Sequence, residues 1–305
     1  MIGILFMFHP LKSSDLVQGF RGTTQLLLKI LLGIVFIAIT FPALAQQRGP
    51  QSHDVQTIVV EGMSIAQPPE FVESLDALRE MTVQKTGIVG YTIRRQFAYL
   101  RELTITENTA MTGIGDIQLS AGRRLIVSKN SALVTINDVK LAKGHNIFIA
   151  DNAVLMAIQD CDFSKVDDSI SIIRNPNLDH IDCGSFPWAG VEVLNLSNNK
   201  LDDRIWSLLP STPSQLWKLN ISNNAGVTTL PDSLAWSRID ELELWGTGLT
   251  SVPAAIPYML DLTRLTLGET CIPADEYKLF YNTFISKIGT ITPAPASFTR
   301  GSHCP

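Results

Sequence analysis

The chain contains little from which a metal centre, a redox centre or a catalytic site could be built. Its 305 residues include four cysteines and five histidines, and no two cysteines form a C-x-x-C motif. We find no phosphate-binding loop, no EF-hand spacing and no nucleophile placed beside a base. These absences argue against metal binding, thiol redox chemistry and enzymatic activity, and we expect no cofactor.

Positive charge is also scarce. The chain has 24 lysines and arginines against 29 aspartates and glutamates, which gives a formal net charge of −5. A protein that binds nucleic acid normally carries a basic patch or an excess of basic residues. The charge balance therefore argues against a nucleic-acid partner.

The apolar run near the N-terminus is short for a membrane span. It extends from Ile30 to Phe41 after Arg21 and Lys29, whereas a transmembrane helix needs about 20 residues. The sequence P-A-L-A that follows has the small-x-small pattern that signal peptidase reads. We therefore interpret residues 1–45 as a signal peptide cleaved after Ala45, and we predict a secreted protein.

An uncleaved signal anchor is the alternative interpretation, and it would leave the rest of the chain outside the cytoplasm on a membrane. Cleavage would remove three basic residues and one acidic residue, which brings the net charge from −5 to −7. Residues 46–56, at the start of the mature chain, are expected to be flexible. A membrane is thus a partner only if the signal segment is retained.

The most informative feature of the sequence is a repeat. An asparagine returns at a nearly fixed interval, each time just after an alternating apolar triplet, and L-N-L-S-N-N-K-L at 194–201 is the clearest copy. Threonine replaces the asparagine in the last two units. The aligned positions, 22 to 25 residues apart, are Asn108, Asn130, Asn152, Asn175, Asn199, Asn224, Thr247 and Thr270. A period in this range predicts a solenoid.

Each unit also predicts a local structure. Two apolar residues that alternate with an exposed residue, such as Leu194 and Leu196, indicate a short strand with one buried face. The asparagine comes where the strand bends into a loop, and its amide can both donate and accept hydrogen bonds. We therefore interpret the asparagines as structural, each satisfying backbone groups that would otherwise be buried without a partner.

This pattern resembles the leucine-rich repeat family, whose core reads L-x-x-L-x-L-x-x-N-x-L. The resemblance extends from about Leu103 to Ile272, and the units before Asn199 are similar to the irregular repeats of receptor L domains. It implies an α/β solenoid, a leucine-rich repeat horseshoe with a parallel β-sheet on its concave face. Short helices or loops would lie on the convex side, and binding would take place on the concave face.

Residues 57–272 are predicted to form this repeat domain, and its first two units are degenerate. Met63 and Thr86 take the asparagine position in those units. The spacers from Phe71 to Leu78 and from Ile93 to Leu100 have apolar residues at helical spacing.

Residues 273–305 are predicted to form a C-terminal cap helix and a tail. Pro273 opens the segment, with Asp275 and Glu276 in its first turn, as is typical of a helix start. A one-sided stripe follows, formed by Tyr277, Phe280, Tyr281, Phe284, Ile285 and Ile288. We expect this stripe to close the open end of the core, since solenoids need such caps.

Four cysteines in an exported chain suggest two disulfides, with three possible pairings. The repeat register puts Cys161 and Cys183 at near-equivalent sites on adjacent coils, and it leaves Cys271 and Cys304 to tie the tail to the last unit. We predict both bridges. The alternative for Cys161 and Cys183 is a pair of free thiols in the core.

Residues that point outward from the strands are the candidate binding residues. Ile126, Phe148, Ala150 and Ile173 are predicted to lie side by side on adjacent strands, with Arg174 at their rim. An exposed apolar cluster in a polar surround is typical of a protein contact. The alternative is that another segment of the chain covers it. A second, weaker candidate for binding is Trp245.

Two sequons, N-L-S at Asn195 and N-I-S at Asn220, match the acceptor for N-glycosylation. Their asparagines are neighbours in the outward column, so glycans there would direct binding toward Phe148. In a bacterial protein the matches would be an accident of the repeat pattern.

The sequence favours a secreted, non-enzymatic recognition module that binds an extracellular protein or peptide on its concave face. The partner's identity is open, and neither nucleic acid nor metal is expected. The alternative hypothesis is a scaffold or adhesin at the cell surface or wall, held in the membrane if the signal segment is retained.

Overall fold

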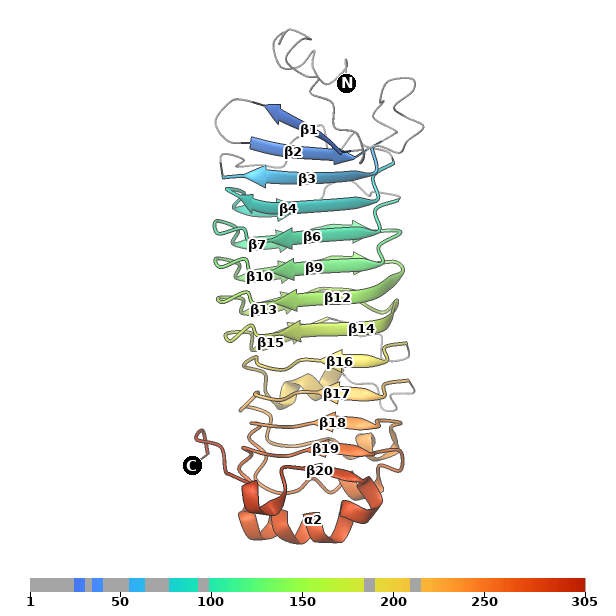
Figure 1. Cartoon of the computed structure of the whole chain (residues 1–305), viewed down its shortest axis with the longest axis vertical. Coiled ribbons are helices and arrows are strands. Elements are labelled where there is room, and N and C mark those ends of the chain that lie inside the picture. Colours follow the sequence, from blue (N-terminus) through green and yellow to red (C-terminus); the bar gives the residue numbers. More distant parts are fainter. Residues whose placement is uncertain are drawn as a thin grey trace.

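The computed structural model describes residues 25–30, 35–40, 55–63, 77–92, 99–183, 190–208 and 215–304. Within these residues the chain winds as a solenoid, and its coils stack along the long axis of the molecule (Figure 1). Successive coils from β3 onward contribute one strand each to a single 13-stranded sheet. Parallel pairing between successive coils is the arrangement that the repeat predicted.

The 13-stranded sheet runs the full length of the described solenoid. Its strands pair in parallel from β3 to β20, whereas β1 with β2 and β2 with β3 are antiparallel. In spatial order the strands are β1 (Gln25–Ile30), β2 (Val35–Thr40), β3 (Thr57–Gly62), β4 (Glu80–Thr86), β6 (Glu102–Thr106), β9 (Arg124–Ser128), β12 (Gly144–Ala150), β14 (Val166–Ile173), β16 (Val193–Asn195), β17 (Lys218–Asn220), β18 (Glu241–Glu243), β19 (Arg264–Thr266) and β20 (Thr290–Thr292).

Short strands also line the other side of the first coils, where the sequence predicted only helices or loops. They form a five-stranded parallel sheet of β5 (Gly90–Thr92), β7 (Gly113–Gly115), β10 (Thr135–Asn137), β13 (Ala157–Gln159) and β15 (His180–Asp182). A third, two-stranded parallel sheet is formed by β8 (Ile117–Leu119) and β11 (Val139–Leu141). In β7, β10, β13 and β15 the middle residue is an isoleucine buried in the core, as Ile136 is in β10.

Short 3-10 helices replace these strands in the later coils. They are η5 (Asp203–Leu208), η6 (Asp232–Trp236) and η7 (Ile256–Tyr258). The helices predicted in the first two spacers lie mostly outside the described residues. Leu78 and Leu100, at the ends of those spacers, are both fully buried.

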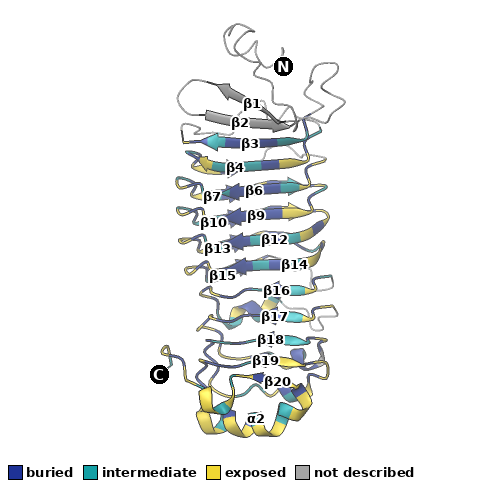
Figure 2. Cartoon of the chain, viewed as in Figure 1, coloured by how far each residue is buried: buried dark blue, intermediate teal, exposed yellow. Residues whose placement is uncertain are grey.

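The alternating apolar residues fill the core as predicted. Figure 2 shows buried positions recurring along the strands of the large sheet. Leu103 and Ile105 are fully buried on β6, and they pair with Leu125 and Val127 of β9. The degenerate first unit follows the same register, since Ile58 pairs with the equivalent residue of the next coil. The repeat therefore extends upstream to β3.

The asparagines form a continuous ladder of buried hydrogen bonds. The backbone N–H of Asn152 donates to Oδ1 of Asn175 at 3.1 Å, and its Nδ2 donates to the carbonyl oxygens of Val127 and Ala150, both at 3.1 Å. Asn130 makes the equivalent contact to Oδ1 of Asn152 at 3.0 Å. Each side chain thus satisfies backbone groups on its own coil and on its neighbours, as the sequence predicted.

Threonines end the ladder at both ends. Thr86 is buried, and its backbone N–H and hydroxyl donate to Oδ1 of Asn108 at 3.0 and 2.8 Å. The hydroxyls of Thr247 and Thr270 donate to carbonyl oxygens of their own coils. Met63, by contrast, is 57% exposed. Its predicted place at the asparagine position is wrong, because a register shift in the strand pairing places Gly62, and not Met63, opposite Thr86.

The C-terminal cap is the helix α2 (Ala274–Ile288). Tyr277, Phe280 and Ile288 are buried, and the rest of the predicted stripe packs against the same core. Gly289, at φ 82°, ends the helix in a conformation that L residues rarely adopt. The chain then adds β20 to the large sheet and a last 3-10 turn, η8 (Pro295–Ser297).

The cysteines behave differently in the two pairs. Cys271 and Cys304 form the predicted disulfide, with their Cα atoms 5.3 Å apart. Cys161 and Cys183 are free thiols, 2% and 1% exposed, so the predicted second bridge is wrong. The register argument placed them correctly as neighbours, but neighbouring thiols can also hydrogen-bond. That hydrogen bond, with burial, raises the pKa of the Cys183 thiol.

The N-terminal apolar run contains β2, which pairs antiparallel with β1 at the start of the run and with β3 after it. Its predicted role as a signal peptide stays a prediction. None of the helices among the described residues is both long enough and apolar enough to cross a membrane.

Replacing a central rung of the ladder should destabilise the protein strongly. In Asn152→Ala the N–H of Asn130 and two carbonyl oxygens lose their partner, at about 1–3 kcal/mol for each buried group. We expect a loss of at least about 3 kcal/mol in urea unfolding. The control is Asn177→Ala, whose amide is exposed and makes one hydrogen bond, to Ala153. A similar loss in both variants would contradict the structural role of the ladder.

The free thiols can be counted by alkylation without a reducing agent. We expect iodoacetamide to label Cys161 and Cys183 in the unfolded protein and neither residue in the native protein, because both are buried and the pKa of Cys183 is raised. Mass spectrometry of the labelled peptides gives the result. An unfolded protein that takes up no label would show that the two residues are bridged after all.

Candidate recognition face

The candidate site is the outer face of the 13-stranded sheet. The residue between the two buried positions of each strand points outward there, and the strand pairing places these residues directly opposite one another. The resulting outer column is Thr104, Ile126, Phe148, Ser171, Asn195, Asn220, Glu243 and Thr266. The phase assigned from the sequence is therefore correct.

Ile126 and Phe148 are the apolar members of this column. They lie opposite each other on β9 and β12, and both side chains are half-buried. Ala150, two places after Phe148, pairs with Ile173 of β14, and these two residues are only 0% and 9% exposed. The accessible apolar surface is thus narrower than predicted.

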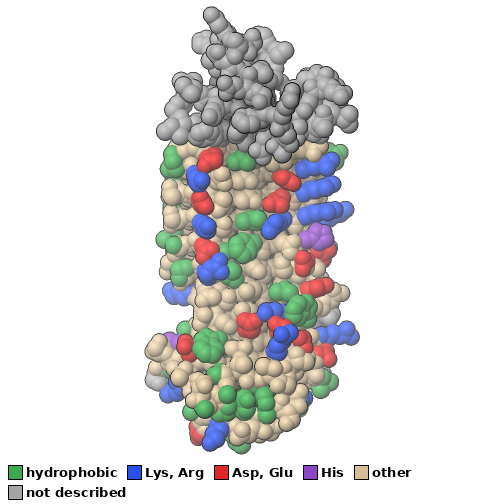
Figure 3. Space-filling view, viewed as in Figure 1, with side chains coloured by type: hydrophobic (Ala, Val, Ile, Leu, Met, Phe, Trp, Pro, Cys, Tyr) green, Lys and Arg blue, Asp and Glu red, His purple; other side chains and the backbone are tan. Residues whose placement is uncertain are grey.

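Charged residues line the ends of the same strands. They have φ values between 50° and 59°, the left-handed conformation that turns each strand into its asparagine. Their signs alternate from coil to coil, and Figure 3 shows blue and red side chains alternating along one edge of the sheet face. The column is Lys85, Glu107, Lys129, Asp151 and Arg174.

Arg174 makes the shortest ion pair within this charged column. Its Nε and Nη2 donate to the two carboxylate oxygens of Asp151 at 2.7 and 2.8 Å. The other pairs are looser, since Lys129 lies 3.9 Å from Glu107. The hydrogen bond from Arg174 lowers the pKa of the Asp151 carboxyl. Arg174 was predicted as a binding residue, and in the structure its guanidinium is already paired with Asp151.

Trp245 lies lower on the same face and is half-buried. Its indole covers Gly268 on the next coil, where a Cβ would stand 2.2 Å from the ring atom Cζ3. The charged groups beside it are paired with one another: Nζ of Lys218 lies 3.0 Å from Glu241 and 2.6 Å from Glu243. Glu243 also raises the pKa of Lys218 through this hydrogen bond. The predicted second candidate is therefore an aromatic surface bordered by neutralised charges.

The two sequon asparagines differ in accessibility. Asn220 is 9% exposed, and its Nδ2 donates to Glu243 at 2.6 Å. A glycan on that nitrogen would have to replace this hydrogen bond. Asn195 is half-buried, and its Oδ1 accepts from the backbone N–H of Ser197 at 3.1 Å. Glycosylation stays a prediction, and the geometry favours Asn195 over Asn220.

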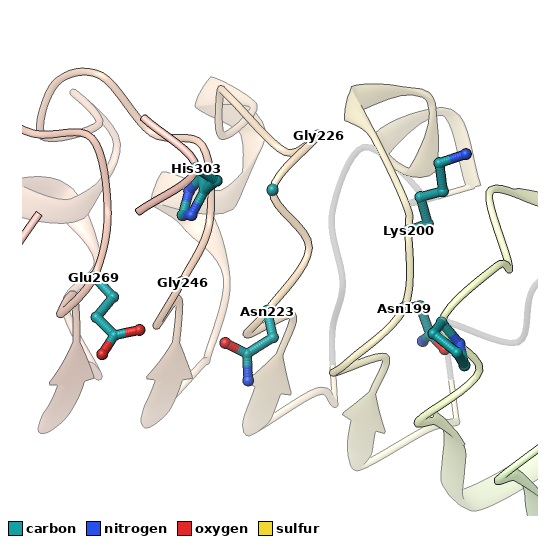
Figure 4. A pocket seen from close by; sticks show the side chains of 9 residues that line it. Asn199, Lys200, Asn223, Gly226, Gly246, Glu269 and His303 are labelled. Carbon is teal, nitrogen blue, oxygen red and sulfur yellow. The ribbon is translucent and has the colours of Figure 1, made fainter. Parts of the chain in front are cut away.

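A hollow of about 290 Å³ lies where the charged edge column is interrupted. Gly246 carries no side chain there, whereas Asn223 and Glu269 stand on the coils on either side. Figure 4 shows Glu269 and His303 at one end of this hollow and Lys200 at the other. Sequence reasoning missed it, because His303 reaches the site only through the folded tail.

His303 also lies close to the C-terminal disulfide. Ligand atoms of Cys271, His303 and Cys304 are within 4.8 Å of one another. The two sulfur atoms are bonded to each other and offer no thiolate, so these three residues do not form a metal centre in the structure. His303 instead lies with Nε2 3.1 Å from the carbonyl oxygen of Thr247.

Comparisons with known proteins give a match to one family model and matches to solved structures. The family model described as Leucine Rich Repeat matches residues 190–212. A leucine-rich repeat protein of Leptospira interrogans is 13% identical, with a TM-score of 0.31, and the match covers 81% of this chain and 97% of that one. An internalin (InlF) of Listeria monocytogenes is 13% identical, with a TM-score of 0.33, covering 80% and 88%. No curated protein sequence matches the chain.

The matched residues contain the clearest sequence unit, and the structure gives that unit the same strand, buried pair and asparagine as its neighbours. The family model therefore identifies a leucine-rich repeat at residues 190–212, and the strands of the other coils stack on it in the same parallel sheet. Domains of this class are protein-interaction modules built on stacked repeats.

The pair formed by Asp151 and Arg174 predicts a pH dependence. Because the folded pKa of Asp151 is lowered, its carboxylate stabilises the fold above the unfolded pKa, and this contribution is lost as the pH falls through the folded pKa. Arg174→Met should bring the Asp151 pKa back toward its ordinary value. NMR titration of the side-chain carboxyl measures it. Lys129→Gln should change this pKa less, and an unchanged value in Arg174→Met would refute the assignment.

Proposed function

We propose that the protein is an exported, non-enzymatic recognition module that binds a protein or peptide through the outer face of its large sheet. The observation that carries the proposal is the partial exposure of Ile126 and Phe148, which lie side by side on adjacent strands. An aromatic anchor in a polar surround is where the binding energy of a protein contact concentrates.

The surroundings of these two residues support a contact of this kind. Thr104 and Ser171 extend the outer column on either side of the apolar pair, and the charges at the strand ends are neutralised by one another. A partner would therefore meet an apolar centre with polar margins. Neutralised margins cost less to desolvate than isolated charges do.

Export is proposed on the basis of residues 1–45. Cleavage after Ala45 would make Gln46 the first residue of the mature protein. The alternative, a scaffold or adhesin with a retained N-terminus, is favoured by the pairing of β2 with β3, which would hold that segment on the sheet. Mass spectrometry of the mature N-terminus distinguishes the two: Gln46 supports export, and an upstream start supports retention.

Phe148→Glu tests the binding face. We expect it to weaken partner binding by about 30-fold or more, as for an anchor worth at least 2 kcal/mol, because a carboxylate replaces an apolar contact. The side chain is half-buried on the outer face, so thermal stability should fall only slightly. Affinity capture from the extracellular fraction of the source, followed by titration of the captured protein, measures the effect.

Thr266→Glu is the matched control, since Thr266 occupies the same outer column five coils away. It should retain the partner. If Phe148→Glu unfolds the protein, Phe148 belongs to the core and the proposed site is wrong. If both variants retain the partner equally, the binding face lies elsewhere.

A further inference from the structure

The starts of four successive strands carry basic residues at the same coil position. Arg101 donates its backbone N–H to the carbonyl oxygen of Arg79 at 2.7 Å, Arg123 donates to Arg101 at 2.7 Å, and His145 donates to Arg123 at 2.8 Å. These residues are therefore direct neighbours on consecutive coils, at the strand spacing of about 4.8 Å. We call Arg79, Arg101 and Arg123 the arginine column.

The arginine column is unpaired within the described part of the chain. All three side chains are exposed, and none makes an ion pair with another described residue. The column ends at His145, whose Nδ1 lies 2.6 Å from a carboxylate oxygen of Asp167. Figure 3 shows the blue side chains stacked along one edge of the sheet, followed by a purple and then by red ones.

The opposite edge of the same strands has the contrary arrangement. There the charges alternate in sign, and Lys85 and Lys129 both contact Glu107. Alternation is thus available to this solenoid and lowers the electrostatic repulsion between coils. Like charges stacked at one coil spacing repel one another instead. No ion pair among the described residues offsets this repulsion in the arginine column, so the column needs another explanation.

Overall charge does not supply that explanation. The chain has a net charge of −5, so the column is a local positive feature on an acidic protein. A line of unpaired positive charge attracts anionic groups and speeds their association. Arginine also binds carboxylates in a two-pronged geometry that lysine cannot form.

We propose that the arginine column binds an acidic helix of a protein partner, with the helix lying along the solenoid axis. This inference rests on the proposed function, because it takes the partner to be a protein. Arg123 directly precedes β9, the strand that carries Ile126. One partner can therefore contact the apolar pair and the arginine column together.

Spacing favours a helix over an extended segment. Carboxylates one helical turn apart rise about 5.4 Å along a helix, close to the coil spacing of about 4.8 Å. Carboxylates on one face of an extended strand are about 6.8 Å apart. Across three carboxylates, the last one is displaced from its arginine by about 1 Å in a helix and by about 4 Å in an extended strand. The flexible arginine side chains can accommodate the displacement of about 1 Å.

The test uses three synthetic peptides and the full protein. The aligned peptide is a helix with three glutamates one turn apart on one face; the scattered peptide has the same composition with its glutamates around the helix; the neutral peptide has glutamine instead. We expect the aligned peptide to bind most tightly, with an affinity that falls as salt rises. Replacing all three arginines of the column by glutamine should weaken this binding by about tenfold or more.

Arg238, Lys278 and Arg300 provide the matched control. They are exposed, and no described residue forms an ion pair with them, so changing all three to glutamine removes the same charge elsewhere. This variant should bind the aligned peptide within about twofold of the wild type. The aligned peptide has no apolar anchor, so its binding reports on the arginine column and not on Ile126 and Phe148. Failure of the arginine column is therefore distinguishable from failure of the proposed binding face.

Three results would overturn the proposal. One is equal binding by the wild type and the arginine-column variant. Another is binding of the scattered peptide, or of a sulfated polysaccharide, as tightly as the aligned peptide, which would make the column a general polyanion site. The third is a lower melting temperature in the arginine-column variant, since that would show the arginines serving a contact within the chain; we expect an unchanged or higher value.

Discussion

The hydrogen-bonded ladder of asparagines is the constraint on which the rest of the structure depends. Each rung links its own coil to the neighbouring ones, as Asn152 does through Asn130 and Asn175. A slip of one residue would leave buried N–H and carbonyl groups without partners, at about 1–3 kcal/mol for each group. The ladder therefore fixes the register of the coils from Thr86 to Asn224, and the register decides which residues face the core and which face solvent.

A fixed register also turns single residues into columns. Because equivalent positions lie one strand spacing apart, any side-chain type that repeats in the sequence becomes a continuous line on the surface. Along one edge of the sheet, residues of opposite charge are neighbours, as Glu107 and Lys129 are. Along the other edge, arginines are stacked on one another. The outer column between these edges holds Phe148. We thus propose that recognition depends on the outer column lying between the charged column and the arginine column on one face.

The sequence predicted the parts of the fold that follow from periodicity. The buried pairs, the ladder and the cap helix all repeat or terminate a pattern, and the bridge of Cys271 with Cys304 follows from its position. It did not predict the second sheet, since three-residue strands with one buried residue, such as Ile136, leave no alternation to detect. It also placed Ala150 among accessible residues, because the exposure of a small side chain depends on how the coils pack and not on the phase of the repeat. The arginine column lay outside the apolar pattern and was visible only once the coils were stacked.

Hydrogen exchange at the ladder's backbone amides tests the account most directly. Five of these amides donate to the Oδ1 of the next asparagine, so they should exchange as slowly as the amides of the core strands. They are the amides of Thr86, Asn108, Asn130, Asn152 and Asn175. Exchange at the rate of exposed loop amides would show that the ladder does not hold the coils in register, and it would contradict the placement of every column described above.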